Sequence, residues 1–296
     1  MKNFKYSLLL LLSLSISNIC LADTDPFEAD PLGAFLEDHF NQPQMTTPDL
    51  SSGSAIVINS KTGDVLFAKN TETVRPIASI TKLITAMVVL DAQLPMEEMI
   101  TITSDEIDRR KGTGSRLGIG TTLSRRQLLQ LALMSSENRA AHALARSYPG
   151  GTEAFIARMN RKVQGLGMRN TVFFDPTGLD NRNVSTASDL ALAVKAAYDY
   201  PIIRRFSTST QDFVENVNGK TLSYKNSNVL VREGLWEINV QKTGYIREAG
   251  RCVVMHAKVG QQPLIIVLLN SRDSSARTND ARTIKTWLEK QPQLWL

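Results

Sequence analysis

The run Ser79–Leu90 constrains the fold more than any other part of the sequence. Its letters, SITKLITAMVVL, leave no continuous polar face on a helix. A helix that is apolar on nearly every side is stable only when other elements surround it. The chain is therefore expected to build a layered core around this buried helix, which begins near Ser79.

Strand-like runs lie on both sides of this helix along the chain. Ser54–Asn59 and Asp64–Lys69 are joined by a short turn and predict a hairpin. Three more strands are predicted towards the end of the chain, at Glu237–Gln241, Cys252–Val259 and Leu264–Leu269. The links between these last three are short, which favours antiparallel pairing. The expected fold class is α/β, with an antiparallel five-stranded sheet flanked by helices.

The middle of the chain, about residues 100–206, is predicted to form an inserted all-helical lobe. Ser124 and Gln127 have the spacing of a capping box before an apolar helix. Two further helices are expected, one at Glu153–Gln164 and one that opens at Thr186 and closes at Pro201. After the last strand, an amphipathic helix with Ile284, Trp287 and Leu288 on one face ends before Pro292.

Residues 1–22 have the pattern of a cleaved secretory signal peptide. Two lysines precede a short apolar run, and small residues near Ala22 supply a cleavage site. The apolar run is too short to span a bilayer, which takes about 20 residues. An uncleaved anchor and a lipid-modified Cys20 are the alternatives. Without the signal peptide Cys252 is the only cysteine, so stability must come from packing and not from an internal disulfide.

The rest of the chain divides into three segments. An acidic leader at 23–53 carries seven acids and no Lys or Arg, with one short helix expected at Leu32–Phe40. The main domain is expected at 54–290, and a tail of six residues follows at 291–296. The tail is short and lacks the basic amphipathic pattern of a membrane anchor, so we expect at most loose membrane association.

The charge balance raises the question of a nucleic-acid partner. The chain has a net charge of +5, and residues 54–296 hold 32 basic against 22 acidic side chains. Aromatic residues make up only 6%, however, and the basic residues form no long run. No nucleic-acid motif is present, and export removes most nucleic acid from reach. We therefore expect no nucleic-acid partner; a basic wall-binding module is the non-enzyme alternative.

Metal and histidine catalysis are not indicated. The three histidines, His39, His142 and His256, lie in different parts of the sequence and have no metal-ligand spacing. No G-x-S-x-G elbow is present, and Cys252 lies in an apolar strand, where a thiolate is disfavoured. We predict no metal and no cofactor.

Ser79 and Lys82 form an S-x-x-K pair at the start of the buried helix. Their spacing places both side chains on one face, one turn apart. A neutral lysine amine can accept the serine proton in place of a histidine. Burial and a second nearby cation would each lower the lysine pKa. A helix N-terminus also supplies N–H groups where an oxyanion would form.

Two further motifs follow in order. Ser136-Glu-Asn138 is expected on a turn between two helices, where its hydroxyl and amide can relay a proton and hold a substrate amide. Lys242-Thr243-Gly244 follows a predicted strand, and the glycine lets a substrate backbone lie against the strand edge. Lys242 would be the second cation that keeps Lys82 neutral. Another K-T-G at residues 61–63 lies in the first hairpin turn, where glycine has a backbone reason.

The ordered set S-x-x-K, S-x-N and K-T-G is typical of penicillin-binding proteins and class A β-lactamases. With these motifs, the chain resembles the low-molecular-mass penicillin-binding proteins, the D-alanyl-D-alanine peptidases. Three stretches resemble the endopeptidase type of that family: Arg75–Leu83, Leu131–Asn138 and Asn170–Gly178. The similarity covers about residues 50–290 and implies a β-lactamase/transpeptidase-like fold.

The resemblance also implies roles for individual residues. Ser79 corresponds to the acylated nucleophile and Lys82 to its proton acceptor. The oxyanion hole would use the backbone N–H groups of Ser79 and Tyr245, and Arg277 lies where relatives bind the substrate carboxylate. The remaining motif residues that the family uses are Ser136 and Asn138 for catalysis and Lys242, Thr243 and Gly244 for substrate binding.

The implied activity is that of a periplasmic serine D,D-peptidase. It would form an acyl-enzyme with peptidoglycan stem peptides and cleave D-alanyl–diaminopimelyl cross-links, and β-lactams would inhibit it covalently. A D-alanyl-D-alanine carboxypeptidase is the first alternative. A serine β-lactamase is the second, but residues 170–180 contain Asp175 and Asp180 and no Glu to activate a deacylating water.

Overall fold

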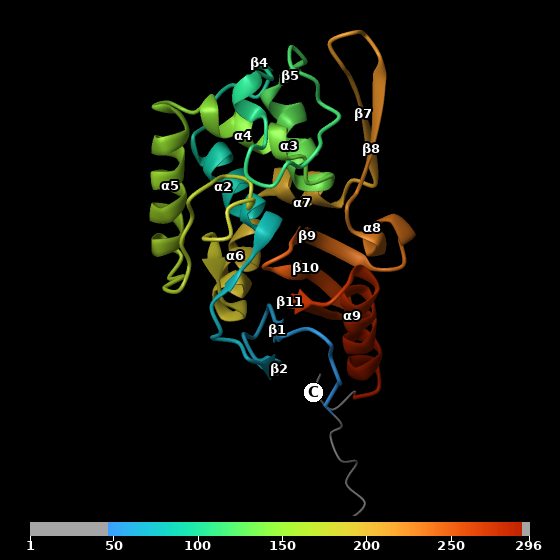
Figure 1. The fold of residues 1–296 in the computed structure, drawn as a ribbon. Helices are drawn as coiled ribbons and strands as arrows, with labels where there is room; N and C mark the ends of the chain where they lie inside the picture. Colours follow the sequence, from blue (N-terminus) through green and yellow to red (C-terminus); the bar gives the residue numbers. More distant parts are fainter. Residues whose placement is uncertain (1–46, 292–296) are drawn as a thin grey trace, which may run out of the picture. The chain divides into compact units, whose positions relative to one another are not determined.

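The computed structural model of the protein describes residues 47–291 (Figure 1). The signal peptide expected at 1–22, the helix expected at Leu32–Phe40 and all but the first residue of the tail lie outside the described residues, as does most of the acidic leader. The protein is therefore described from the end of that leader through the last helix.

A five-stranded sheet with the strand order β2-β1-β11-β10-β9 forms the centre of the fold. Every neighbouring pair is antiparallel, and central register pairs include Val57 with Ile266 and Val254 with Val267. The predicted antiparallel five-stranded sheet is thus confirmed, and β9 lies at one edge. The strand bounds are β1 Ser54–Asn59, β2 Val65–Lys69, β9 Glu237–Ile246, β10 Gly250–Val259 and β11 Gln262–Ser271.

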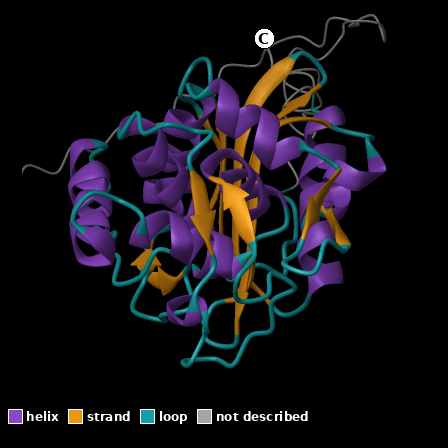
Figure 2. Ribbon diagram, turned by 90° about the horizontal axis from the view of Figure 1, so that it is seen from above, coloured by secondary structure: helices purple, strands orange, loops and turns teal. Residues whose placement is uncertain are grey.

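Helices cover both faces of this sheet (Figure 2). The buried side chains of β1 alternate between two apolar clusters, as the pleat of a strand requires. Val57 packs in one cluster with Ile284 of α9 (Ser274–Glu289), whereas Ile56 packs in the other with the α2 and α6 helices. The amphipathic helix predicted around Ile284 is confirmed, and it covers one face of the sheet.

The buried helix predicted from Ser79 is present, but its first turn differs. Residues Ala78–Thr81 form a 3₁₀ turn, η1, and the α-helix α2 runs from Lys82 to Asp91. Every residue of α2 from Lys82 to Val89 is buried. The 3₁₀ turn is tighter than an α-helix, and it places Ser79 at the point where the chain enters the core.

Helices α3 to α7 pack around α2 and confirm the inserted helical lobe. Ser124 caps α3 and forms the predicted capping box with Gln127. Pro201 does not only end a helix as predicted: it occupies the first turn of another one, where its missing N–H is not needed. The helices are α3 Arg125–Met134, α4 Asn138–Arg146, α5 Gly151–Gly165, α6 Ala187–Tyr198, α7 Pro201–Thr208 and α8 Val229–Glu233, with the 3₁₀ turn η2 at Ser104–Glu106.

Two features of the strands differ from the sequence prediction. Strand β9 does not end at Gln241 but continues through the K-T-G motif to Ile246. A second hairpin, β7 (Gln211–Glu215) with β8 (Thr221–Lys225), was not predicted. It projects beyond the sheet beside α8 (Figure 1). Two short pairings complete the fold: β3 (Arg75–Pro76) with β6 (Val184–Ser185), and β4 (Met99–Thr101) with β5 (Thr122–Ser124).

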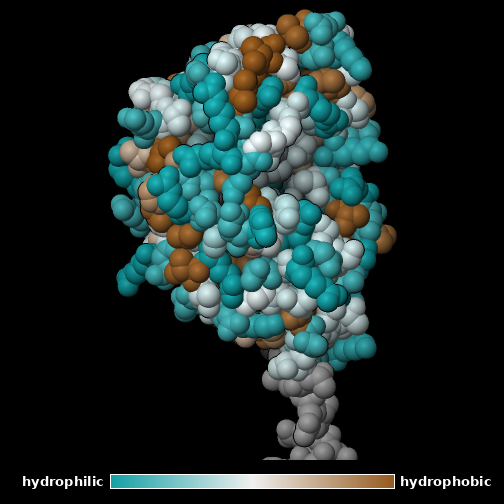
Figure 3. Space-filling model, viewed as in Figure 1, coloured by the Kyte–Doolittle hydropathy of each residue, from teal (hydrophilic) through white to brown (hydrophobic). Residues whose placement is uncertain are grey.

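The visible surface is largely hydrophilic, with scattered apolar side chains (Figure 3). The most exposed large apolar residues are far apart in sequence and include Val65, Met99 and Leu235. No helix within residues 47–291 is long and apolar enough to cross a membrane.

Candidate active site

Ser79 lies in the 3₁₀ turn η1, directly after a residue in an unusual backbone conformation. Ala78 has φ 48°, a left-handed value that costs a residue with a β-carbon on the order of 1–2 kcal/mol. The turn is held from the other side by Gly178: a β-carbon on Gly178 would lie 1.9 Å from the Ala78 carbonyl oxygen. Such strain persists only where the surroundings enforce it, and it is common at functional sites.

Lys82 begins α2 and directs its amine at Ser79. The Nζ atom lies 2.8 Å from Ser79 Oγ, 2.7 Å from Asn138 Oδ1 and 2.7 Å from the Thr177 carbonyl oxygen. The lysine side chain is fully buried, and no carboxylate is among these three partners. The S-x-x-K spacing therefore produces the predicted serine–lysine contact.

Burial lowers the pKa of Lys82 from 10.5 to about 7, against a smaller opposing effect of Asp175 and Glu137. Lys242, the second cation expected to keep Lys82 neutral, is not among the groups that shift the Lys82 pKa. The pKa of Lys242 itself lies well below its ordinary value, first because of burial and then because of the charges of Lys82 and Arg277. Loss of hydration is thus the main reason that Lys82 can be a neutral base near pH 7.

Ser136 and Asn138 lie on the predicted turn, between the end of α3 and the start of α4. Ser136 has φ 63°, a second left-handed non-glycine residue at the site. Asn138 accepts from Lys82 through Oδ1 and donates through Nδ2 to Thr113 Oγ1 at 3.2 Å. Its amide orientation is therefore fixed from both ends, and it links the lysine to the loop that carries Thr113.

The third motif lies inside the edge strand β9 rather than after it. A β-carbon on Gly244 would lie 2.9 Å from the Ile77 carbonyl oxygen and 3.1 Å from Ser79 N, so only glycine lets the strand approach η1 this closely. Thr243 donates through its hydroxyl to Ser227 Oγ at 2.7 Å. Lys242 is fully buried and donates to the Thr243 carbonyl at 2.9 Å.

Tyr245 and Arg277 complete the set of predicted site residues. A cavity of about 280 Å³ is lined by residues of all three motifs together with these two, namely Ser79, Ser136, Asn138, Thr243, Gly244, Tyr245 and Arg277. Arg277, on α9, is 7% exposed and donates to the Cys252 carbonyl at 3.3 Å. Lys82 and Lys242 lie beneath this cavity, so the structure brings together every residue predicted for the site.

The structure adds residues that the sequence did not single out. Thr113, Ser227 and Ser274 line the same cavity, as does Arg251. The first three are small hydroxyl-bearing residues and Arg251 is a cation of a common type, so no sequence motif identifies them. The Thr177 carbonyl is an additional partner of Lys82, and because a backbone oxygen has no sequence signature, only the fold reveals it.

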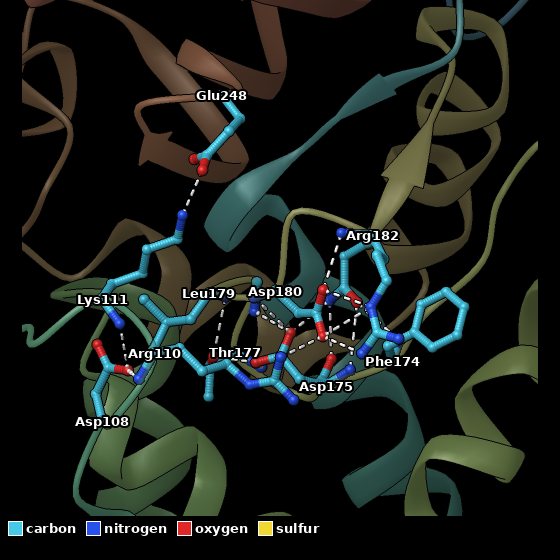
Figure 4. Close-up of polar contacts among 12 residues, drawn as sticks. Asp108, Arg110, Lys111, Phe174, Asp175, Thr177, Leu179, Asp180, Arg182 and Glu248 are labelled. Atoms are coloured by element: carbon cyan, nitrogen blue, oxygen red, sulfur yellow. Dashed lines mark hydrogen bonds and ion pairs between the residues drawn. The ribbon is translucent and has the colours of Figure 1, made fainter.

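A loop at residues 175–183 supports the site from the side of Gly178. Asp175 accepts hydrogen bonds from the backbone N–H of Thr177 and Gly178, and from Asn183 Nδ2 at 2.8 Å. Figure 4 shows Asp180 in the same loop between Arg110 and Arg182, each with a nitrogen within 2.8 Å of its carboxylate. The Arg182 hydrogen bond is the largest effect that lowers the pKa of Asp180. Both aspartates are thus held in structural contacts.

The residues that the sequence analysis excluded from catalysis make contacts outside the serine–lysine site. His142 contacts Glu106 at 3.3 Å, and His256 is buried in β10 and stacks on Tyr198. Cys252 is buried, and burial raises its pKa to about 11. The K-T-G at 61–63 forms the turn between β1 and β2. Residues 47–291 contain no cluster of three or more His, Cys, Asp or Glu side chains that could hold a metal.

The fold and the serine–lysine site together define a serine hydrolase in which a buried lysine replaces histidine. Comparison with known proteins narrows this class. Residues 41–273 match the model of the D-alanyl-D-alanine carboxypeptidase family, peptidase family S11. The chain belongs to this family of serine D,D-peptidases.

Individual relatives agree with this assignment. The chain is 42% identical to a D-alanyl-D-alanine endopeptidase of Pseudomonas aeruginosa, across 98% of this chain and 89% of the relative. It is 43% identical to a D-alanyl-D-alanine endopeptidase of Escherichia coli, across 82% and 78%. The crystal structure of the Streptomyces K15 DD-transpeptidase is similar with a TM-score of 0.76 at 29% identity, covering 82% of this chain and 98% of the other.

Proposed function

We propose that this protein is an endopeptidase that cleaves D-alanyl–diaminopimelyl cross-links in peptidoglycan through an acyl-enzyme on Ser79. The observation that carries the proposal is the 2.8 Å contact between Ser79 Oγ and the buried amine of Lys82, whose hydrogen-bond partners include no carboxylate. The endopeptidase relatives, which match most of the chain, favour cross-link cleavage. Removal of a terminal D-alanine is the second candidate, supported by the family description.

In the acylation step, Ser79 Oγ attacks the carbonyl carbon of the D-alanyl residue while Lys82 takes the hydroxyl proton. The bond to the leaving nitrogen then breaks, and that amine departs after it gains a proton from Lys82, with Ser136 as a relay. The backbone N–H groups of Ser79 and Tyr245 stabilise the oxyanion. These two groups come from η1 and from the residue after Gly244, which approach each other closely.

In the second step, water attacks the ester carbonyl and releases the D-alanyl carboxylate, which restores the Ser79 hydroxyl. Asn138 holds the Lys82 amine in place throughout, because it accepts from that amine at 2.7 Å. The substrate lies as an additional strand along the free edge of β9, with its carboxylate directed towards Thr243 and Arg277. A β-lactam would acylate the same serine and leave slowly.

Digestion of purified muropeptides by the mature protein tests the proposal. Cross-linked dimers should yield monomers, and Ser79→Ala should abolish this conversion. Loss of one alanine from monomeric pentapeptides, with dimers left intact, would instead identify a carboxypeptidase. No change in either substrate would point to a binding role.

We also propose the organisation and location that this activity requires. Residues 1–22 would direct export and be cleaved, residues 23–53 would remain as an acidic leader, and the peptidase domain would extend over 54–290 with the helical insertion at about 100–206. The protein would act in the periplasm with at most loose membrane association. Edman sequencing of the exported protein should begin at Asp23.

A further inference from the structure

The active-site cavity is lined by two guanidinium cations with no anion to balance them. These are Arg251 and Arg277. Within residues 47–291, no Asp or Glu forms an ion pair with either of them. Uncompensated cations at a cleft attract anionic ligands. One carboxylate would leave part of this charge unmatched.

Arg251 differs from Arg277 in position. It stands opposite Tyr245 in the pairing of β10 with β9, and its Cζ atom lies 3.6 Å from the centroid of the tyrosine ring. Tyr245 is 51% exposed and marks the outer end of the cavity. The contact holds the guanidinium over the ring but satisfies none of its N–H groups. Arg251 is therefore held in place at the mouth, and no side-chain hydrogen bond within residues 47–291 occupies its donors.

Arg251 is also electrically close to Arg277. The charge of Arg251 adds to burial in lowering the pKa of Arg277. Two guanidinium groups that repel each other across one cavity are both stabilised when each pairs with its own carboxylate. The arrangement thus suits a ligand with two negative groups, one deep beside Arg277 and one at the mouth beside Arg251.

This inference rests on the proposed endopeptidase function, and it concerns the strand that departs when a cross-link is cleaved. The departing strand has a carboxylate on the carbon next to the released amine, as terminal D-alanine does. Unlike D-alanine, it also carries further carboxylates along its stem peptide. We propose that Arg277 binds the first carboxylate and that Arg251 binds a second one on the departing strand, which makes Arg251 a specificity residue for cross-links.

Binding of the departing strand can be measured without any turnover. The probe is the monomeric tripeptide muropeptide that ends in diaminopimelate, used to slow labelling of Ser79 by a fluorescent penicillin. Arg251→Gln should weaken this competition about tenfold, the loss expected for one charge-assisted hydrogen bond. Arg251→Lys should restore most of it, and competition by D-alanine alone should be the same in all variants.

Arg247→Gln is the matched control, because Arg247 is an exposed cation in the turn between β9 and β10 and is not part of the cavity lining. It removes the same charge four residues before Arg251, outside the cavity lining, and should leave competition unchanged. A monomer whose stem carboxylates are amidated should slow penicillin labelling equally in the wild-type protein and in Arg251→Gln. Equal weakening by Arg247→Gln would reduce the effect to net charge and overturn the proposal.

Another result would also overturn the assignment of Arg251, namely unchanged competition in Arg251→Gln. Competition is the ratio of the labelling rates with and without the muropeptide in each variant, so a change in labelling alone does not enter it. The proposed function is scored separately, by whether the wild-type protein converts cross-linked dimers to monomers. A protein that fails on dimers but still shows the Arg251-dependent competition would keep the binding site and lose the endopeptidase assignment.

Discussion

Gly178 lies so close to Ala78 that no side chain fits between it and the turn that carries Ser79. A β-carbon there would meet the Ala78 carbonyl oxygen at 1.9 Å and Ser79 N at 2.8 Å. Gly178 also has φ 86°, so it needs the left-handed region as well as the space. The position of the nucleophile is therefore set by a contact with a residue 99 positions further along the chain.

Gly178→Ala should displace η1 and cost at least about 3 kcal/mol of unfolding free energy, because backbone atoms have to move. The rate at which penicillin labels Ser79 should also fall, because η1 carries this serine. Gly167→Ala is the control: it has φ 78° but no atom within 4 Å of its new β-carbon, so it should cost only about 1–2 kcal/mol. Chemical denaturation of both variants checks this, and equal losses would mean that the contact with Ala78 is unimportant.

Ser79→Ala should eliminate covalent labelling by a fluorescent penicillin, since the hydroxyl is the atom that would be acylated. Ser135→Ala is a suitable comparison, because Ser135 Oγ donates to the Leu131 carbonyl at 2.8 Å and is not among the predicted site residues. That variant should keep its labelling. Persistent labelling of Ser79→Ala, detected on a gel, would show that the nucleophile is another residue.

The acylation rate should rise with pH through about 7 and level off above it. Lys82 has a pKa lowered to about 7 by burial, so its amine is protonated below that pH and neutral above it. Only the neutral amine can accept the Ser79 proton, and the rate should drop about tenfold for each pH unit below 7. Stopped-flow measurement with a penicillin checks this; a rate independent of pH between 5 and 9 would argue against Lys82 as the base.

Lys82→Arg tests the same point at fixed pH. A guanidinium stays protonated at any accessible pH and cannot accept the proton. Acylation should fall by 10²-fold to 10⁴-fold, roughly the contribution of a general base. Circular dichroism should confirm that the variant remains folded before the rate is interpreted.

Benzylpenicillin should acylate the protein and remain attached far longer than acylation takes. Deacylation in class A β-lactamases depends on a Glu that activates water. In this chain the corresponding region has Asp175 and Asp180, and both carboxylates are occupied by hydrogen bonds within their loop. Intact-mass spectrometry over time checks the lifetime, and rapid return of the free mass would support the β-lactamase alternative.

Stability in acid should depend on Glu106. Burial raises the pKa of this carboxyl, but hydrogen bonds from His142, Arg146 and Thr103 outweigh burial and bring the pKa down to about 2. A carboxyl with a depressed pKa contributes stability that is complete above about pH 4.5 and is lost as pH falls towards 2. Glu106→Gln should lower Tm at pH 7 more than at pH 3. A difference that is the same at both pH values would contradict this.

The elements with strong patterns were predictable from sequence, and those set by tertiary contact were not. Ser54–Asn59 was predicted to the residue because alternate side chains enter two apolar clusters. The hairpin of β7 and β8 was missed because each strand buries only one residue, Val214 or Tyr224. Strand β9 was ended too early, because the buried Lys242 and Thr243 interrupt its apolar pattern.

The same distinction between local pattern and tertiary contact applies to the candidate site. Spacing on one helix placed Ser79 and Lys82 together, whereas Asn138 was assigned to the site only through the motif set and the family that the chain resembles. The left-handed φ of Ala78 and of Ser136 carries no local sequence signature, since neither residue type favours it. Of the two expected causes of the low Lys82 pKa, burial is the one found, and Lys242 is not among the groups that shift it.

The free edge of β9 has a consequence for how copies of this protein meet one another. Within residues 47–291 no other strand pairs with the outer edge of β9, and such an edge is a template on which any extended chain can add, including an edge of a second copy. Here the cavity beside this edge carries Arg251 and Arg277, so a second copy that approaches it with its own cavity brings like charges together. The cations that would draw in an anionic peptide thus also act against close approach of a second copy, and substrate attraction and colloidal stability share the same side chains.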